Sequence, residues 1–418
     1  MEIIYLHQYF NTPDMPFGTR SYEMARRMVA KGYKVRMITS YRENDRKVKD
    51  WFVTDESGIE VHWYPVPYSN HMGFVARVMA FLRFAWAAQK KTIELSGDII
   101  FASSTPLTIA LPAIPAARRK KIPMVFEVRD LWPEMPIAVG ALKNPVSRFL
   151  AKKLELWAYS NSDAIVALSP GMKEGVVRSG FEEQRIAVIP NSSDNTEFQY
   201  NRNAADSFLS KRPWLMSSPL LVYAGSLGST NGVGFLVDVA KELDLLGSDI
   251  KILVVGDGAE RDSILEKANF EAVLNKNFFA EELLPKKEIP ALLSAATLAS
   301  VLFIDVPEMR ANSANKFFDA LASGTPVLVN FGGWINELVE RNSIGVSVWK
   351  KSASEVAVFL EEKMHDEKWL EESGKNARYM AEKYFSRDIL ANQLMEVLER
   401  TLDGDTDSIS KIAPGEYK

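Results

Sequence analysis

Residues 312–330 have the sequence NSANKFFDALASGTPVLVN, which predicts a short amphipathic helix followed directly by a buried strand. Apolar residues from Ala314 to Ala322 recur at the i, i+3, i+4, i+7 and i+8 positions that form one face of a helix. Gly324 is typical of the residue that ends a helix, and the run 326–329 is typical of a strand inside a parallel sheet. This stretch therefore predicts an α/β fold.

The polar residues of the same helix form the first candidate site. Ser313 is expected where the helix begins, so free backbone N–H groups, a hydroxyl and the Lys316 ammonium one turn on would form an anion site. Asn315 and Asp319 share the polar face with Lys316, and the acceptor-only carboxylate of Asp319 suits two vicinal sugar hydroxyls. The alternative is an ordinary amphipathic helix with solvated charges, and the rest of the chain has to decide between the two.

Length and composition indicate a two-domain globular protein. At 418 residues the chain is too long for one hydrophobic core, and no cysteine is available for disulfides or thiolate metal sites. The four histidines do not pair at metal-ligand spacing, so no metal and no cofactor are expected. The chain opens in a strand-like run without a signal sequence, and no stretch approaches the roughly 18 apolar residues of a spanning helix. We therefore expect a cytoplasmic protein.

The charge is distributed unevenly along the chain. Residues 1–190 carry 26 Lys and Arg against 19 Asp and Glu, whereas residues 191–418 carry 24 against 35. A basic first half predicts a negatively charged partner for that half alone. Nucleic acid is not expected as that partner, because no recognised binding motif accompanies the charge.

Strand-like runs alternate with helical patterns almost throughout. Strands are expected at residues 2–6, 34–39, 98–102, 123–127, 163–168 and 186–189, and then at 220–223, 250–255, 298–302, 326–329 and 345–348. Helices between them are expected at residues 19–31, 144–160, 233–246, 259–267 and 314–323. Such alternation predicts parallel sheets, and two series of it predict two doubly wound domains joined by the polar stretch 191–218. Ligands bind at the carboxyl ends of such strands, so the loops of two facing domains would converge on one cleft.

Two glycine-rich turns lie between a strand and a helix in the second half. The first is residues 223–232, YAGSLGSTNG, and the second is residues 256–260, GDGAE. Glycines at such turns let backbone N–H groups approach a phosphate closely. Each turn alone is weak evidence, but together with the Ser313–Asp319 helix they favour a nucleotide-diphosphate site.

At this point the chain resembles the family-4 retaining glycosyltransferases, which have the two-Rossmann GT-B fold. The similarity covers nearly the whole chain and rests on HQYF at residue 7, PFGTR at 16, IPNSSD at 189, VVGDG at 254 and DALASGTP at 319. FEVRDLWP at 126 and NFGGW at 330 look more narrowly like bacterial O-antigen and capsule transferases, with N-acetyl-L-fucosamine transferases as the nearest subgroup. The resemblance implies domains at 1–195 and 196–385 and a helix at 386–402 that crosses back to the first. The tail 403–418, polar and without apolar periodicity, is expected to be disordered.

The resemblance also implies roles for particular residues. Implied donor-binding residues are Gly18, Gly225, Ser226, Asn231, Gly256, Asp257, Arg310, Asn312, Ser313, Asn315, Lys316 and Asp319. Implied acceptor-binding residues are Ser104, Arg20, Glu127 and Arg129, and the catalytic candidates are Lys316, Asp319, Arg129, Asp130 and His7.

Several positions depart from the family's pattern. Ala311 stands where the family has the first of two glutamates, and Ser226 and Asn231 stand where it has an Arg and a Lys. Lys316, helped by Arg20 or Arg310, is expected to neutralise the diphosphate instead. Arg129 replaces the family's histidine and stays protonated, so it cannot be a general base. The departing phosphate would then accept the proton in a front-face transfer, with Asp130 or Glu127 as less favoured nucleophiles.

The segment 72–91 combines aromatic and aliphatic residues with Arg77, Arg83, Lys90 and Lys91. Helices that lie in a membrane interface have this composition, although a core helix with a basic rim has it too. We interpret the chain as a peripheral enzyme of the inner membrane face that transfers a sugar from a UDP-sugar to a polyprenyl-diphosphate-linked saccharide. Two alternatives stay open: a UDP-sugar epimerase of related fold, and an inactive nucleotide-sugar-binding protein.

Overall fold

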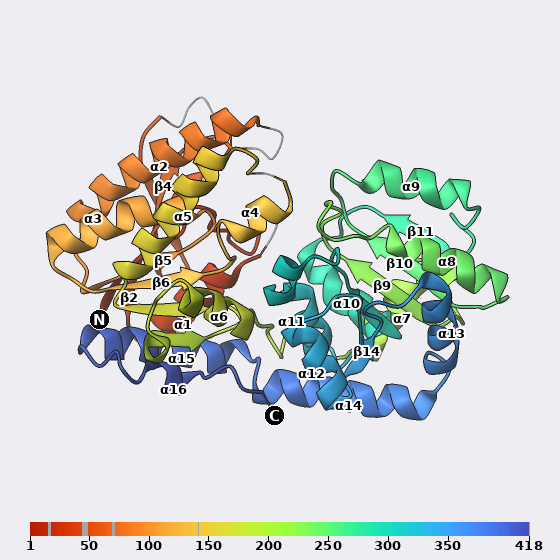
Figure 1. Ribbon diagram of the computed structural model, residues 1–418. Coiled ribbons are helices and arrows are strands. Elements are labelled where there is room, and N and C mark those ends of the chain that lie inside the picture. The colour runs from red at the N-terminus through yellow and green to blue at the C-terminus, as the bar shows by residue number, and fades with distance from the viewer. Residues whose placement is uncertain (16–17, 44–48, 69–71, 141, 418) are drawn as a thin grey trace. The chain divides into compact units, whose positions relative to one another are not determined.

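The computed structural model describes every residue except 16–17, 44–48, 69–71, 141 and 418. It divides into two compact units, one formed by residues 1–190 with 387–416, the other by residues 191–386 with the C-terminal end. Each unit is an α/β domain around its own sheet (Figure 1). The predicted fold class of two Rossmann-like domains is confirmed.

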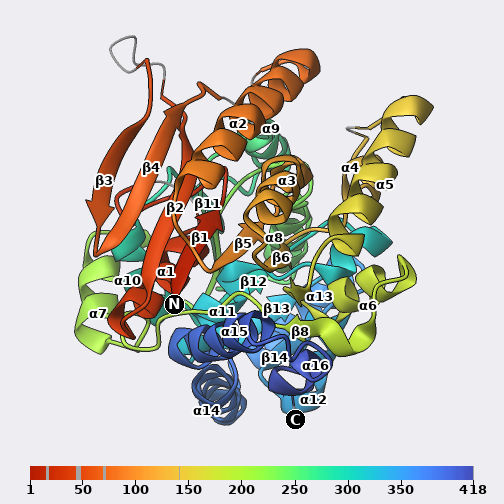
Figure 2. The same ribbon diagram turned by 90° about the vertical axis from the view of Figure 1, so that its left-hand side faces the viewer.

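The first unit is built on an eight-stranded sheet in the order β3-β4-β2-β1-β5-β6-β7-β8. Figure 2 shows this order from the left edge of the sheet inward. All neighbouring pairs are parallel except β3 and β4. The strands are β1 Glu2–Leu6, β2 Lys34–Tyr41, β3 Phe52–Glu56, β4 Ile59–Pro65, β5 Ile99–Ser103, β6 Met124–Val128, β7 Ala164–Ala167 and β8 Ile186–Val188. The helices are α1 Arg20–Ala30, α2 Phe74–Glu94, α3 Ala110–Lys120, α4 Glu134–Ala138, α5 Pro145–Ser160, α6 Pro170–Arg178, α15 Arg387–Leu402 and α16 Ile409–Ile412.

The second unit has a six-stranded parallel sheet in the order β11-β10-β9-β12-β13-β14. Its strands are β9 Leu220–Ala224, β10 Lys251–Val255, β11 Phe278–Glu281, β12 Leu298–Val301, β13 Val327–Val329 and β14 Gly345–Ser347. Its helices are α7 Arg202–Ser210, α8 Phe235–Leu245, α9 Arg261–Phe270, α10 Ile289–Ala295, α11 Asn315–Ala322, α12 Trp334–Asn342, α13 Ala353–Lys363 and α14 Glu367–Lys383. Helix α11 and strand β13 are the pair predicted from residues 312–330, and the apolar face of α11 is fully buried.

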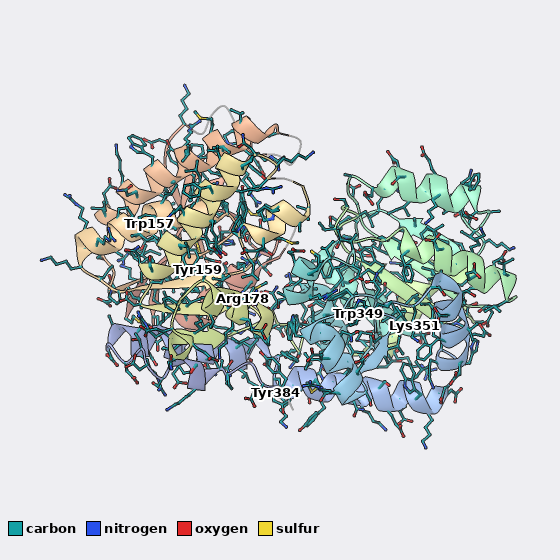
Figure 3. All side chains as sticks on the ribbon, in the orientation of Figure 1. Trp157, Tyr159, Arg178, Trp349, Lys351 and Tyr384 are labelled. Carbon is teal, nitrogen blue, oxygen red and sulfur yellow. The ribbon has the colours of Figure 1, made fainter. Side chains whose placement is uncertain are left out.

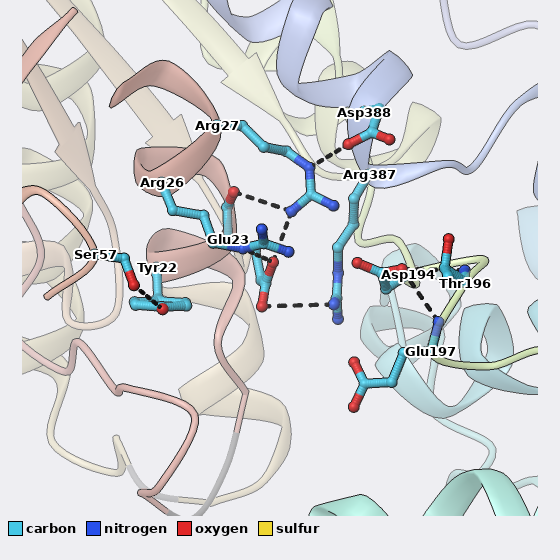
Figure 4. A network of polar contacts seen from close by, with 10 residues as sticks. All are labelled: Tyr22, Glu23, Arg26, Arg27, Ser57, Asp194, Thr196, Glu197, Arg387 and Asp388. Atoms are coloured by element: carbon cyan, nitrogen blue, oxygen red, sulfur yellow. Dashed lines mark hydrogen bonds and ion pairs between the residues drawn. The ribbon is translucent and has the colours of Figure 1, made fainter. Parts of the chain in front are cut away.

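The chain returns to the first unit through helix α15, at the position expected for the crossing helix. Glu23 on α1 holds this helix by ion pairs to Arg27 at 2.6 Å and to Arg387 at 3.7 Å. Arg27 in turn binds Asp388 (Figure 4). Because Glu23 and Arg387 are both largely buried, these pairs anchor α15 where water screens them little.

Two expectations about the connecting segments differ from the structure. The stretch expected as a linker, 191–218, belongs to the second unit and carries α7, which packs on α10 and buries Phe208. The tail expected to be disordered forms α16, with Ile409 buried and the Ala413 carbonyl accepting a hydrogen bond from the Val188 N–H. The tail is ordered because a few of its apolar residues pack against the edge of the sheet. Such packing does not need a periodic sequence pattern.

Candidate active site

Lys316 is the central cation of the second unit. It extends from α11 toward the turn after β9, where its Nζ donates a 2.7 Å hydrogen bond to the Tyr223 hydroxyl. The same Nζ lies 4.0 Å from the centroid of the Tyr223 ring. A Cβ placed on Gly225 would lie 3.0 Å from this Nζ, so the ammonium rests directly on the first glycine turn. Helix α11 and the glycine-rich turn therefore meet at Lys316.

The electrostatic state of Lys316 is unusual for a lysine. Burial lowers its pKa from an ordinary 10.5 to about 7, and Tyr223 offers it a neutral acceptor rather than a carboxylate. A desolvated lysine without a counter-ion is unfavourable, and an arriving anion would restore its charged form. A lysine in this state is expected to bind an anion such as phosphate.

The two glycine turns of this unit touch each other. A Cβ on Gly256 would lie 1.9 Å from the Gly225 carbonyl oxygen, and one on Gly258 would lie 2.6 Å from the Leu227 backbone. Glycine is required at both positions because any side chain would collide with backbone. The turns after β9 and β10 therefore form one layer of backbone beside Lys316.

The residues before α11 are held by the rest of the second unit. Ser313 Oγ accepts the Asn191 N–H at 3.0 Å, and the Ser313 carbonyl accepts from the Asn191 side chain at 2.6 Å. The Asn312 carbonyl accepts the Trp334 indole N–H at 2.8 Å. The helix itself begins at Asn315, so Ser313 lies before its first turn and is a fixed part of the scaffold. Ser313 is thus placed beside the predicted anion site, with its hydroxyl already used as an acceptor.

The remaining residues predicted to bind the donor differ in their exposure and in their hydrogen bonds. Asp319 is partly exposed one turn after Lys316, and Asn315 is exposed. Ser226 is exposed and its carbonyl accepts the Tyr223 hydroxyl proton. The side chain of Asp257 accepts the Gly258 N–H, while the backbone N–H of Asn231 bonds the Gly228 carbonyl.

Arg310 is placed outside this group. Its guanidinium lies 5.1 Å from the ring centroid of Trp349, which is labelled in Figure 3, and 3.5 Å from Asp305. Its Nε is buried without a hydrogen-bond partner among the described residues. Among the described residues its contacts are thus to Trp349 and Asp305, and a role beside Lys316 stays a prediction.

In the first unit, His7 and Arg129 form a defined pair at the ends of β1 and β6. Arg129 Nη1 lies 3.1 Å from His7 Nε2, and Ser21 Oγ lies 2.8 Å from His7 Nδ1. A guanidinium only donates, so Nε2 must be the acceptor and the ring proton must be on Nδ1. Burial and then the charges of Arg129 and Arg42 hold the pKa of His7 well below 6.5. His7 is therefore a neutral residue that orients Arg129, and its lone pair is not free to act as a base.

Asp130 is the ionisable carboxyl next to this pair. Burial raises its pKa from 3.8 to about 6, although the Arg129 charge and a 3.4 Å contact with Thr105 oppose the shift. Ser104 is buried, and its hydroxyl accepts the Arg129 N–H at 2.9 Å. Ser104 thus fixes the backbone of Arg129 rather than presenting a free hydroxyl. Gly18 is exposed near the same edge, while Pro16 and Phe17 of the predicted glycine loop lie outside the described residues.

Arg20 and Glu127 have a different position from the one expected of acceptor-binding residues. Their side chains form a buried ion pair at 2.9 Å, and Ser103 donates a second hydrogen bond to Glu127 at 2.5 Å. Arg20 also donates to the Ile189 carbonyl at 2.8 Å and to the Pro190 carbonyl. Both charged groups have partners within the first unit, which supports a structural role, and their role in acceptor binding stays a prediction.

Sequence reasoning missed two residues that organise these sites. Tyr223 orients Lys316, and Ser21 accepts the hydrogen bond of the His7 Nδ1–H. Tyr223 could have been noticed as the only polar aromatic residue in the run Leu220–Ala224 directly before the glycine turn. Ser21 carried no signal of its own.

Within the described part of the chain, no group of three His, Asp or Glu residues could hold a metal ion. No described helix is long and apolar enough to cross a membrane.

Comparison with known proteins identifies the class. Residues 17–192 match the glycosyl transferase 4-like domain, and residues 207–380 match the glycosyl transferases group 1 family. The chain therefore contains a glycosyl transferase 4-like domain followed by a glycosyl transferases group 1 domain. The narrower similarity to N-acetyl-L-fucosamine transferases has no counterpart among these matches and stays a prediction.

Two relatives match part of the chain in sequence, and a solved structure matches its fold. The chain is 27% identical over 250 residues to 2-deoxystreptamine glucosyltransferase of Streptomyces kanamyceticus, a match that covers 59% of this chain and 60% of that protein. It is 25% identical over 252 residues to the capsular polysaccharide biosynthesis glycosyltransferase CapM of Staphylococcus aureus, covering 59% and 63%. The matched region thus spans about 60% of the length of these relatives. The structure of Anabaena HepE in complex with UDP and glucose superposes with a TM-score of 0.72 over 96% of this chain and 99% of that one, at 16% identity.

Proposed function

We propose that this glycosyltransferase transfers a sugar, with retention, from a UDP-sugar to a polyprenyl-diphosphate-linked saccharide in bacterial polysaccharide biosynthesis. The observation that carries the proposal is the Lys316 ammonium, which lies over the Gly225 turn and donates a hydrogen bond to the neutral Tyr223 hydroxyl. A buried cation at a backbone-lined turn fits the diphosphate of a nucleotide sugar, which is the anion that leaves during transfer. Asp319 lies one turn further along α11, and its carboxylate is the group that we propose accepts hydrogen bonds from the two ribose hydroxyls.

Groups of the first unit support the mechanism that we propose. His7 is neutral and its Nε2 lone pair accepts from Arg129, so neither residue can remove the proton of the acceptor hydroxyl. The departing diphosphate oxygen is then the group that takes this proton, while Lys316 stabilises the negative charge that develops on it. Transfer from the front face retains the configuration of the sugar. It requires that the protein place the donor and the acceptor, and it needs no base from the protein. Metal-independent transfer is part of the same proposal, because Lys316 supplies the cation.

Helix α2 supports a membrane-bound acceptor. Its inner face packs in the core through Ala80, Phe84 and Ala88, whereas Val75, Met79, Leu82 and Trp86 form an exposed stripe at i, i+4, i+7 and i+11. Arg83 and Lys90 flank this stripe, and Lys90 Nζ lies 3.5 Å from the centroid of Trp86. An exposed apolar stripe with a basic border fits an anionic lipid surface. The two interpretations of this segment, core helix and membrane helix, thus apply to opposite faces of one helix.

Together these features favour a cytoplasmic enzyme that is peripherally associated with the inner membrane. The similarity to CapM supports a role in surface polysaccharide assembly, including O-antigen or capsule, and an N-acetylated deoxy sugar is the donor that the narrower resemblance implies. The partners in this proposal are a UDP-sugar, a lipid-linked saccharide and the membrane surface, without nucleic acid.

The experiment that tests the donor is a calorimetric titration with UDP, GDP and ADP. We expect UDP to bind at least tenfold more tightly than the other two, and equal affinity for all three would contradict a UDP-sugar donor. The epimerase alternative is tested by incubating the protein with UDP-sugars alone, since an epimerase converts the sugar without any acceptor. UDP binding without turnover on a full panel of acceptors would support the inactive binding protein.

A further inference from the structure

Arg42 is a half-buried cation directly after β2, and none of the carboxylates that the structure describes pairs with it. Its guanidinium donates a hydrogen bond to the Asn11 side chain and lies 5.8 Å from the ring centroid of Tyr9. Neither Arg42 nor Arg77 forms an ion pair with a carboxylate of the residues that the structure describes. An uncompensated charge in a partly buried position is unfavourable unless an anion completes it.

Arg77 is a second such cation, in the first turn of α2. The positive end of a helix dipole disfavours a cation, and this first turn contains no acidic residue to offset it. The Arg77 Nε is buried and lacks a hydrogen-bond partner within the described part of the chain. A donor in this state is available to a ligand oxygen.

The aromatic contacts of Tyr9 indicate that Arg42 and Arg77 both lie near this ring. Phe81, one turn after Arg77 on the same face of α2, lies 6.4 Å from the Tyr9 ring and 6.0 Å from the Tyr68 ring. Burial raises the pKa of Tyr9, and the charges of both Arg42 and Arg77 act against that shift. Arg42 and Arg77 therefore approach Tyr9 from different elements of the first unit.

Gln8 adds a neutral hydrogen-bonding group beside Tyr9. Its side chain is only 1% exposed, yet neither its amide nitrogen nor its amide oxygen has a partner among the described residues. The Gln8 carbonyl accepts hydrogen bonds from Thr39 at 3.1 Å and Ser40 at 2.6 Å, so its backbone is fixed. Buried amides are almost always hydrogen-bonded, which makes this one a candidate to bind a ligand.

We infer that Arg42, Arg77 and Gln8 form a phosphoryl-binding site in the first unit, which takes the diphosphate of the acceptor. Two guanidinium forks and an amide N–H are the donor set that phosphate oxygens prefer. The inference rests on the proposed function for the identity of the acceptor, and it adds the residues that would hold its charged group. It is separate from Lys316, which belongs to the other unit and faces the donor diphosphate.

The test uses the full-length protein with saturating UDP, so that the donor site is occupied. Inorganic pyrophosphate and a water-soluble short-chain prenyl diphosphate are titrated into the wild type and into Arg42→Gln, Arg77→Gln and Gln8→Leu. We expect each arginine variant to weaken the Kd for both ligands at least tenfold and Gln8→Leu to weaken it severalfold, with the Kd for UDP unchanged. The matched control is Arg178→Gln on α6, an exposed arginine of the same unit, which should leave every Kd unchanged.

Each other outcome would overturn the inference. Unchanged pyrophosphate and prenyl-diphosphate affinity in folded arginine variants would show that these residues are merely solvated cations. An effect confined to vesicles of anionic phospholipid would assign them to a lipid headgroup surface instead. If Arg77→Gln fails to fold, the variant Arg77→Lys is used instead, because lysine keeps the positive charge but lacks the paired N–H donors of the guanidinium. Wild-type affinity in Arg77→Lys would also contradict the site. Failure of the wild type to bind UDP would contradict the proposed function, while the comparison among arginine variants would still decide this inference.

Discussion

Lys316 and Tyr223 form a two-point contact, with a 2.7 Å hydrogen bond from the ammonium to the phenol oxygen and 4.0 Å between the ammonium and the ring centroid. The phenol hydroxyl in turn donates to the Ser226 carbonyl at 2.7 Å. The turn after β9, the strand end and the helix α11 are therefore joined through one lysine. This joint is the part of the molecule on which our account of catalysis depends.

The first prediction concerns turnover. Removal of the Lys316 ammonium should lower kcat by about 10²–10³, the usual effect of losing one stabiliser of transition-state charge. Binding of the UDP-sugar should fall less, because the charge on the diphosphate increases as the bond breaks. The measurement is the kcat and KM of Lys316→Ala with a fixed acceptor. Near-normal kcat in this variant would transfer the role to another cation such as Arg310.

The second prediction concerns pH. Because the free protein has a Lys316 pKa of about 7 rather than 10.5, the lysine is charged below pH 7 and neutral above it. A diphosphate binds the charged form, so affinity for UDP-glucose should fall by up to about 100-fold as pH rises from 6 to 9, because the charged fraction falls by about that factor. The diphosphate diester does not titrate in this range. Lys316→Arg, which stays protonated, should bind with little dependence on pH.

The same shift predicts the pH dependence of stability. Between pH 7 and 10.5 the unfolded chain holds a proton on Lys316 that the folded protein lacks. The contribution of Lys316 to the free energy of unfolding should therefore rise with pH across this window. A wild type whose ligand affinity is flat from pH 6 to 9 would contradict both statements, since it would mean that Lys316 has an ordinary pKa.

The third prediction concerns Asp319. Asp319→Ala should cost about 1.5–3 kcal/mol of UDP affinity, the range for a hydrogen bond to a charged group. Asp319→Asn is the matched control for shape, and it should lose part of this affinity because it keeps one acceptor oxygen. Isothermal titration of UDP measures both effects. Wild-type affinity in a folded Asp319→Ala would mean that this face of α11 does not contact the nucleoside.

The fold was predictable where one pattern dominated a segment. The i, i+3, i+4 spacing before Gly324 predicted α11, and the short β-branched runs predicted most parallel strands. In both cases the apolar residue types themselves indicate which positions are buried. Strands β3 and β4 were missed because they form an antiparallel hairpin around Ser57-Gly58 with no helix between them. Strand β11 was missed because its four residues, Phe278–Glu281, are too few to show a period.

The candidate site was predictable in its components more than in its contacts. The glycine turns and Lys316 were identified from residue type and order. The pairing of Arg20 with Glu127 could not be, since 107 positions separate them and only the folded sheet brings them together. The same holds for the His7 tautomer, which depends on a hydrogen bond from Arg129 to Nε2 and one from Nδ1–H to Ser21, residues that lie in two different elements. Long-range pairing of charged residues leaves no local signal in a sequence.

The fourth prediction concerns membrane binding. Leu82→Ser with Trp86→Ser removes two residues of the exposed α2 stripe and should weaken binding to anionic vesicles at all salt concentrations. Arg83→Glu with Lys90→Glu should abolish only the salt-sensitive part, since charge effects are screened over about 8 Å at physiological ionic strength. Vesicle sedimentation measures both, and turnover on a short-chain soluble acceptor should be unchanged. A wild type that ignores anionic vesicles would contradict the membrane role of this stripe.

Acceptor-dependent transfer tests the central claim most directly. The purified protein is incubated with a UDP-sugar panel and a short-chain polyprenyl-diphosphate saccharide, while released UDP and the mass of the acceptor are measured together. The account predicts that one donor gives UDP release only when acceptor is present, with one sugar added to the acceptor for each UDP and none of either in Lys316→Ala at the same time point. Release of UDP without a gain in acceptor mass, or interconversion of the UDP-sugar in the absence of acceptor, would contradict it.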